Sequence, residues 1–320
     1  MARPVSKANL GDIVTAGRDN SMTDRDYLKG VAAGIAATLL WSLSGVFARH
    51  MESKDAWLLN GWRGLATAVC LGVFLAIAYR GNLLGQFRKI EARALLACAG
   101  FFAAGSTLYL TALEGAPVAN VSCLTAISPV FAALLAWLFL QERGDGRIWL
   151  ATVLAIGGTA VIFMDGMSLG WQSLAGNGIA LATAFCFAGQ TVALRRFRSV
   201  DMVPAIAVGA LAVFLILGVG FGHLAISGHD LKIVLLMGAI QLAAPIALYV
   251  YAARYLRAMQ LSLITLLDVV FNPLWAWIGV GEVPQRNAML GGLVIVAAVL
   301  LTLMRRPVQQ PVIQDSGLGP

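Results

Sequence analysis

The chain has 320 residues, of which 59% are apolar and only 12% are Asp, Glu, Lys or Arg. Soluble domains carry about 25% charged residues, so this chain has too few charges to cover a globular protein of its size, and an ordinary soluble enzyme is excluded. The formal net charge of +7 could suit nucleic acid, but the basic residues occur in short clusters between apolar runs, and anionic membrane lipid is the better partner.

Residues 1–29 hold five basic and four acidic side chains and no hydrophobic stretch. They lack the features of a signal or transit peptide, so we expect a mostly disordered polar tail. Ten apolar segments follow, and each is long enough to cross a hydrocarbon core of about 30 Å as a helix. They span residues 30–48, 57–79, 94–113, 117–140, 148–164, 177–194, 203–222, 232–252, 259–280 and 288–304, and a polar tail, 305–320, ends the chain.

Lys and Arg are unevenly divided between the loops on the two sides of the predicted bundle. If the N-terminus is inside, the cytoplasmic segments contain 18 of them and the outer segments contain four. Because cytoplasmic loops carry the excess of positive charge, we predict that both termini are cytoplasmic. We expect an integral protein of a bacterial inner (plasma) membrane.

The two halves of the chain resemble each other. Ser128–Glu142 (SPVFAALLAWLFLQE) aligns with Asp268–Glu282 (DVVFNPLWAWIGVGE) at an offset of 140. Each half has an odd number of spans, so the second half must enter the membrane from the opposite side. We predict an all-α integral membrane protein with ten transmembrane helices in two inverted five-helix repeats, 30–164 and 177–304. Such repeats can open a central site to each face in turn, as in carriers; a duplication that only gave a stable bundle is the alternative.

Three segments carry a resemblance to a known family. They are GWRGLATA around Arg63, YLTALEGAPVANVSCLTAISPVFAALLAWLFLQE, and LLDVVFNPLWAWIGVGE. Through them the chain resembles the EamA-type branch of the drug/metabolite transporter (DMT) superfamily over roughly residues 28–304. The resemblance implies a central cavity lined mainly by helices 1, 3, 4, 6, 8 and 9 and the transport of small metabolites, often outward. The family usually has Glu-Pro where this chain has Asp268-Val269, so the acid is kept and the kink-forming proline is lost.

Asp268 is the one acid deep in a predicted span. It follows the start of its helix by about nine residues, which at ~1.5 Å each places it roughly 13 Å deep, near the midplane. A carboxyl group at that depth is costly and is by default a functional hypothesis. It could take up and release a proton during transport. The alternatives are a structural ion pair and a hydrogen bond to a neighbouring helix.

Arg63 is the one basic residue inside a span. Three roles are open: it can pair with Asp268, bind a substrate carboxylate through its fork of donors, or extend toward the outer headgroups. The resemblance implies an Arg at this place and favours a structural or gating role.

Other residues in or next to the spans could serve the site or the fold. Glu142 and Glu282 occupy equivalent positions in the two repeats, and we interpret them as caps of the helices that follow. Pro129, Pro245 and Pro273 each remove a backbone hydrogen bond, which either frees a carbonyl to line a cavity or only bends the helix. A mixture of aromatic walls and a few donors and acceptors would suit an amphiphilic substrate; the candidates are Trp41, Tyr109, Asn120, Gln190, Gln241, Tyr249 and Asn272.

These features favour a secondary active transporter of small polar metabolites, with amino acids or related compounds as the first choice, an exporter that uses a proton or solute gradient. The alternatives are an exchanger or facilitator without proton coupling and a non-transporting receptor or structural protein. An enzyme is disfavoured because no second deep acid and no buried His accompany Asp268. We expect a monomer or homodimer with no nucleic-acid partner, no cofactor, no metal and no disulfide, since the four cysteines lie inside apolar runs.

Overall fold

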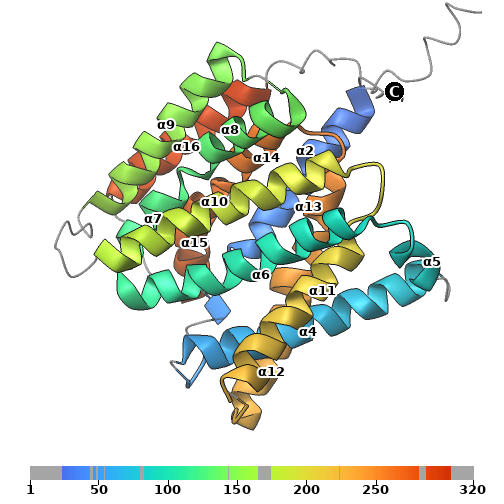
Figure 1. Ribbon diagram of the computed structural model, residues 1–320. Coiled ribbons are helices and arrows are strands. Elements are labelled where there is room, and N and C mark those ends of the chain that lie inside the picture. Colours follow the sequence, from blue (N-terminus) through green and yellow to red (C-terminus); the bar gives the residue numbers. More distant parts are fainter. Residues whose placement is uncertain are drawn as a thin grey trace, which may run out of the picture.

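The computed structural model describes residues 24–43, 46–47, 50–53, 55–79, 83–142, 144–164, 174–222, 224–280 and 286–303. In these ranges every regular element is a helix (Figure 1). Most of the two predicted polar tails, and Glu282, lie outside the described residues.

The first half of the chain contains five predicted spans. Its helices are α2 (Asp24–Trp41), α4 (Ala56–Ala78), α6 (Ala92–Gly115), α7 (Val118–Thr125), α8 (Ser128–Leu140) and α9 (Gly146–Phe163), with α7 and α8 forming one span. A five-residue helix, α5 (Leu83–Phe87), occupies a segment that we expected to be a loop.

The second half follows the same plan with more interruptions. Its helices are α10 (Leu174–Arg196), α11 (Val203–Val213), η3 (Phe214–Gly220), α12 (Gly228–Leu236), η4 (Met237–Ala243), α13 (Ala244–Ala253), α14 (Ala258–Thr265), α15 (Leu267–Val280) and α16 (Arg286–Leu303). The segments η3 and η4 are π-helical turns that continue α11 and α12. One span therefore runs through α11 and η3, another through α12, η4 and α13, and a third through α14 and most of α15.

The predicted start of the first span, at residue 30, was wrong. It begins at Asp24, six residues before the expected start, and ends at Trp41. The polar tail thus ends earlier than expected, because Tyr27 is buried in the core and Lys29 pairs with Asp26 across 3.1 Å on the exposed face of the helix. Nine other segments of the described chain are long and apolar enough to cross a membrane. The charges in its first turns keep α2 out of that set, and it is the tenth predicted span.

The packing of helices follows a two-fold pattern. Counterparts from the two repeats pack directly on each other: α4 on α11, α8 on α14, and α9 on α16. The pair α6 and α10 corresponds to the pair α13 and α2, with the repeats exchanged. Two copies related by a two-fold axis require this exchange. Because each copy has five spans, the axis lies in the membrane plane and the repeats are inverted.

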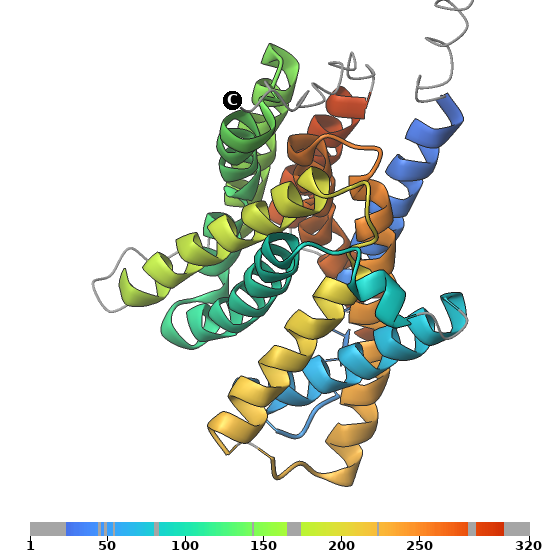
Figure 2. The same ribbon diagram turned by 45° about the vertical axis from the view of Figure 1, so that its right-hand side comes forward.

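The helix pairs α9–α16 and α4–α11 lie at opposite sides of the bundle. In Figures 1 and 2, α9 and α16 stand on one side, α4 and α11 on the other, and α10, α6, α2 and α13 lie between them. The α9–α16 contact depends on glycine: a Cβ atom on Gly158 would lie 2.8 Å from the carbonyl oxygen of Gly291. The middle of the molecule is thus formed by helices of both repeats.

Two spans are broken at equivalent positions. The fourth span changes direction at Ala126 and Ile127, between α7 and α8, and the ninth at Leu266, between α14 and α15. Pro129, in the first turn of α8, has no N–H for the preceding turn and accounts for the first break. The second break forms without a proline, since Val269 is the residue at that place.

A threonine precedes each break. The hydroxyl group of Thr125 donates to the carbonyl oxygen of Ser122 (3.1 Å), and that of Thr265 donates to the carbonyl oxygen of Ser262 (2.7 Å). Such bonds from Thr to the preceding turn compete with the helical ladder and bend helices. At the second break the N–H of Leu266 bonds three residues back, to Leu263, instead of four. The same kind of Thr bond thus accompanies the break where proline is lost.

The other two prolines have different effects. Pro245 lies in the first turn of α13, directly after η4, and cannot donate to the carbonyl of Gln241 four residues earlier. The wider π-turn of η4 occurs where this bond is missing, and π-turns often mark functional sites. Pro273 lies inside α15, which continues through it.

Candidate functional site

The break at Leu266 places Asp268 in the first turn of α15, a helix that packs against α16 and α2. The residue is half-buried, and its carboxyl oxygen Oδ1 is buried without a hydrogen-bond partner among the described residues. The side chain of Asn272, one turn further along, donates to the backbone carbonyl of Asp268 (3.0 Å). A buried carboxyl oxygen without a partner is costly, so it marks a place where a proton or a ligand group can bind.

Arg63 is held by Asn60, one turn earlier on its own helix α4, instead of by Asp268. Its Nη2 donates to Oδ1 of Asn60 (2.8 Å), which also accepts the hydroxyl group of Ser106 (3.1 Å). The Nε of Arg63 is buried and has no partner in the described part of the chain. No ion pair joins Arg63 to Asp268, two residues that the structure describes. Arg63 therefore keeps one donor free inside the bundle.

Tyr109 lies near both Arg63 and Asp268. Its hydroxyl group, on α6, is close enough to interact electrostatically with both Arg63 and Asp268. Its ring also faces that of Phe187 on α10, with centroids 6.2 Å apart. The three residues come from α4, α6 and α15, so one site would use elements of both repeats.

A pair of aromatic side chains, Trp41 and Tyr249, forms a second part of the site. The rings of Trp41 and Tyr249 lie 5.0 Å apart, which joins the end of α2 to α13. The hydroxyl groups of Tyr249 and Thr191 are hydrogen-bonded. Gln241, in η4, donates through Nε2 to the carbonyl of Trp41 (3.1 Å), while its Oε1 is buried without a partner among the described residues.

Helix α15 reaches the same region through Trp275, whose Nε1 donates to the hydroxyl group of Ser42 (2.8 Å). Our sequence reasoning missed four polar residues at the site: Ser42, Asn60, Ser106 and Thr191. Asn60 could have been found, because it precedes Arg63 by three residues and shares its helix face. The partners on other helices give no signal in the sequence.

Two predicted site residues have a different setting from the one we expected. Asn120 donates to the side chain of Asn177 (3.1 Å), a contact between α7 and the start of α10. Glu142 does not cap α9: that helix is capped by Asp145, which accepts from the N–H groups of Arg147 and Ile148, while Glu142 binds Arg195 at 3.1 Å. The reason is distance along the chain, since Asp145 is the residue directly before the first turn of α9. Gln190 is half-buried on α10, next to Thr191.

Burial differs between the two halves of the ninth span. From Ala258 to Ile264 every residue of α14 is buried, whereas Asp268, Asn272 and Trp275 on α15 are half-buried. Arg63, Tyr109 and Trp41 are half-buried as well. These six side chains are therefore less completely buried than those of α14, whereas Gln241, Tyr249 and Thr191 beside them are buried. We call the face at which α2 begins the proximal face and the opposite one the distal face.

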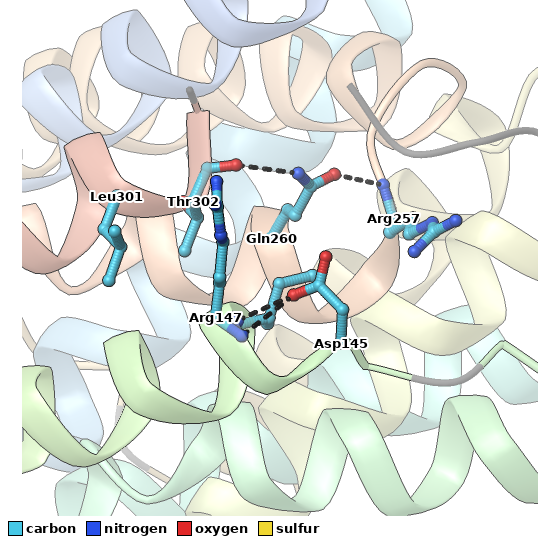
Figure 3. A pocket seen from close by; sticks show the side chains of 7 residues that line it. Asp145, Arg147, Arg257, Gln260, Leu301 and Thr302 are labelled. Atoms are coloured by element: carbon cyan, nitrogen blue, oxygen red, sulfur yellow. Dashed lines mark hydrogen bonds between the residues drawn. The ribbon is translucent and has the colours of Figure 1, made fainter. Parts of the chain in front are cut away.

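A pocket lies at the proximal face (Figure 3). It is lined by Asp145, Arg147, Ile148, Arg257, Gln260, Leu301 and Thr302, from the ends of α9, α14 and α16. Gln260 lies between its walls, donates to the carbonyl of Thr302 (3.2 Å) and accepts from the N–H of Arg257 (3.4 Å). None of the predicted site residues lines this pocket.

The sequence matches the EamA-like transporter family over residues 28–164 and again over residues 174–304. The chain belongs to the EamA-like transporter family. It is a transporter of the DMT superfamily with two EamA domains, one in each half of the chain, and not an enzyme. It is an integral membrane protein, and the relatives described below are bacterial.

Several relatives have names that describe export. The pseudopaline exporter CntI of Pseudomonas aeruginosa is 26% identical over 60% of this chain and 68% of its own length. A probable terminal-alkyne amino-acid exporter of Streptantibioticus cattleyicolor is 29% identical over 77% of this chain and 86% of its own. Protein RarD of Escherichia coli is 23% identical over 88% of this chain and 96% of its own. A solved crystal structure has a TM-score of 0.74 at 18% identity, covering 85% of this chain and 96% of the other, and shares the fold.

Proposed function

We propose that this EamA-family transporter is a secondary active exporter of small polar metabolites and that Asp268 couples export to a proton gradient. The observation that carries this proposal is the buried Oδ1 of Asp268, which has no hydrogen-bond partner in the described chain and lies directly after a helix break. Burial favours the protonated carboxyl, and access to water favours the charged one. A change of access between the two faces would therefore load and release a proton.

The chemistry around the site favours amino acids or related zwitterions as substrates. Arg63 has a free buried donor for a carboxylate, and Asp268 and Gln241 have free buried acceptors for an amine. Trp41 and Tyr249 provide an aromatic wall for an apolar side chain. The names of two relatives, the exporters of pseudopaline and of a terminal-alkyne amino acid, agree with this choice.

We further propose that the proximal face is cytoplasmic, in a plasma membrane. The excess of Lys and Arg on that side supports this orientation. The half-buried site residues lie on the distal side of the buried helix α14, so this conformation would be open to the outside. An exporter would have this outward-open conformation after it has released its substrate.

The test uses purified protein in liposomes of inner-membrane lipid with a ¹⁴C-labelled mixture of amino acids. Counterflow measures exchange without a gradient, and an imposed pH gradient measures coupled net transport. We expect Asp268→Asn to retain counterflow and to lose the stimulation by the pH gradient, because the amide keeps the shape but cannot titrate. Glu114→Gln is the matched control, since it neutralises an exposed acid at the end of α6 and should behave as the parent does.

Three results would contradict the proposal. If the pH gradient stimulates Asp268→Asn as it does the parent, Asp268 is a structural residue and another group couples transport to protons; if the gradient does not stimulate the parent, the chain is an exchanger or facilitator without proton coupling. If the folded parent moves no label in either assay, amino acids are not its substrates, and the same assays with other labelled metabolites decide between a carrier of other solutes and a receptor.

A further inference from the structure

Arg195 joins the ends of three helices at the proximal face. Its Nε donates to Oε1 of Glu142 (3.1 Å), just after α8, and its Nη1 donates to the backbone carbonyls of Arg254 (3.0 Å) and Ala253 (3.4 Å) at the end of α13. The side chains of Arg195 and Glu142 are only 10% and 21% exposed. One guanidinium group thus holds α8, from the first repeat, against α10 and α13 from the second.

A second set of contacts continues from Arg254. Its Nη2 lies 3.4 Å from Oδ1 of Asp201, and Asp201 also accepts the hydroxyl group of Tyr79 and the N–H of Val203. Burial, and then the hydrogen bond to Asp201, raise the pKa of Tyr79 to about 12, so its hydroxyl group remains a donor at physiological pH. These contacts add the end of α4 and the start of α11. We call Tyr79, Glu142, Arg195, Asp201 and Arg254 the proximal network.

Tightly packed apolar side chains lie beside the proximal network. Ala136 on α8, Val192 on α10 and Ala258 on α14 form one buried cluster. Together with the buried helix α14, this cluster keeps α8, α10 and α14 tightly packed at the proximal end of the bundle. The proximal end is therefore closed in this conformation, and the proximal network spans the helices that would have to separate to open it.

The network is also connected to the candidate site through two parallel helix contacts. Thr191 bonds Tyr249 within the site, and Arg195 bonds the carbonyl of Ala253 in the network. On both α10 and α13 the second contact follows the first by four residues, which is one helical turn of about 5.4 Å. A ligand that moves Tyr249 would therefore move the helix turn that Arg195 holds.

We propose that Arg195 is the positioning residue of a gate at the proximal face, which keeps this face closed by holding Glu142 and the end of α13. This inference rests on the proposed alternating access and identifies the contacts that must break for inward opening. Arg195 does not touch the substrate; it acts through α13 and Tyr249. A guanidinium group suits this role, because its fixed fork can bind a carboxylate and carbonyls on two helices at once.

The test measures the gate without any substrate. Spin labels are attached at Arg147, exposed at the start of α9, and at Ser199, exposed just after α10, in a protein whose four cysteines have been replaced. Double electron–electron resonance in liposomes then gives the distances between the labels. We expect one main distance for the parent and a second, longer one for Arg195→Gln and for Glu142→Gln. The ratio of the long to the short component should rise at least about tenfold, as expected for the loss of a charge-assisted hydrogen bond.

Arg196→Gln is the matched control, because it removes the same charge from the next residue, which is exposed. Its distances should equal those of the parent. The proposal is overturned if folded Arg195→Gln and Glu142→Gln show only the parent distance, or if Arg196→Gln produces the same shift. If Arg195→Gln does not fold, Glu142→Gln decides, since it keeps the guanidinium group and its bonds to α13. Because no substrate is present, a failure here is distinct from a failure of the transport assays.

Discussion

Asp230, at the start of α12, fixes the loop between α2 and α4 on the distal face. Its carboxylate is almost completely buried and accepts the N–H groups of Glu52 and Ser53, both at 2.9 Å. His229 adds a bond to the carbonyl of His50 (3.0 Å). The Asp230 carboxylate thus binds backbone groups that are distant from it in sequence. The guanidinium group of Arg195 does the same at the helix ends of the proximal face.

We expect Asp230→Ala to lower the free energy of unfolding by about 1–3 kcal/mol, because two backbone N–H groups lose their acceptor. Limited proteolysis should then cut faster within residues 50–55, and thermal unfolding should occur at a lower temperature. Asp55→Ala is the comparison: it removes an exposed cap of α4 and should cost only about 1 kcal/mol without exposing this loop. Equal proteolysis rates for the two variants would contradict this role of Asp230.

Close helix contacts at glycine set the distance between α9 and α16. A Cβ atom on Gly158 would lie 2.8 Å from the carbonyl oxygen of Gly291 and 2.9 Å from a side-chain carbon of Ile295, whereas one on the adjacent Gly157 would meet nothing within 4 Å. In a membrane, small residues allow such close backbone contact between helices. Gly158 is thus needed for the close contact between α9 and α16, whereas the adjacent Gly157 is not.

We expect Gly158→Ala to destabilise the protein by about 1–3 kcal/mol, because the two helices must separate to admit the methyl group. Gly157→Ala should be neutral or stabilising by up to about 1 kcal/mol, since alanine is the better helix former. Thermal unfolding in detergent, followed by tryptophan fluorescence, compares the two. An equal loss in both variants would show that the α9–α16 contact does not determine stability.

The elements show which features the sequence could predict. The apolar runs predicted α4 and α16 to within two residues, because the length of a span follows from the thickness of the bilayer. The start of α2 was missed because charged residues in the first turns of a helix look like those of a polar tail. The break at Leu266 was not expected, since a single Thr that bonds to the preceding turn is far less visible in a sequence than a proline.

At the candidate site the sequence identified the residues better than their contacts. Asp268, Arg63 and Gln241 were predicted as polar groups inside spans, and all three have a buried atom without a partner in the described chain. The binding of Ser106 to Asn60 and of Glu142 to Arg195 depends on how the helices are rotated against their neighbours. That rotation is set by packing across the whole bundle, and no single segment encodes it.

The whole molecule consists of two copies whose helix pairs exchange across a two-fold axis. The orientation of this assembly in the membrane stays a prediction from the excess of basic residues on the proximal side. We expect Glu114→Cys, at the exposed end of α6, to react with a membrane-impermeant maleimide added to intact cells. Ser199→Cys, at the proximal face, should react only after the membrane is opened. The reverse pattern would contradict cytoplasmic termini.

The two copies differ at the break in their fourth helix, and this difference has an energetic consequence. Pro129 makes the break in the first copy permanent, because no donor exists to complete the helix there. In the second copy Val269 keeps its N–H, which donates to the carbonyl of Leu266, and the hydroxyl group of Thr265 bonds to the carbonyl of Ser262. The first copy therefore cannot complete its helix at the break, whereas the second copy has the donor to do so. If the copies exchange shapes during transport, the two states would have unequal free energies, and the empty protein would rest facing one side of the membrane more often than the other.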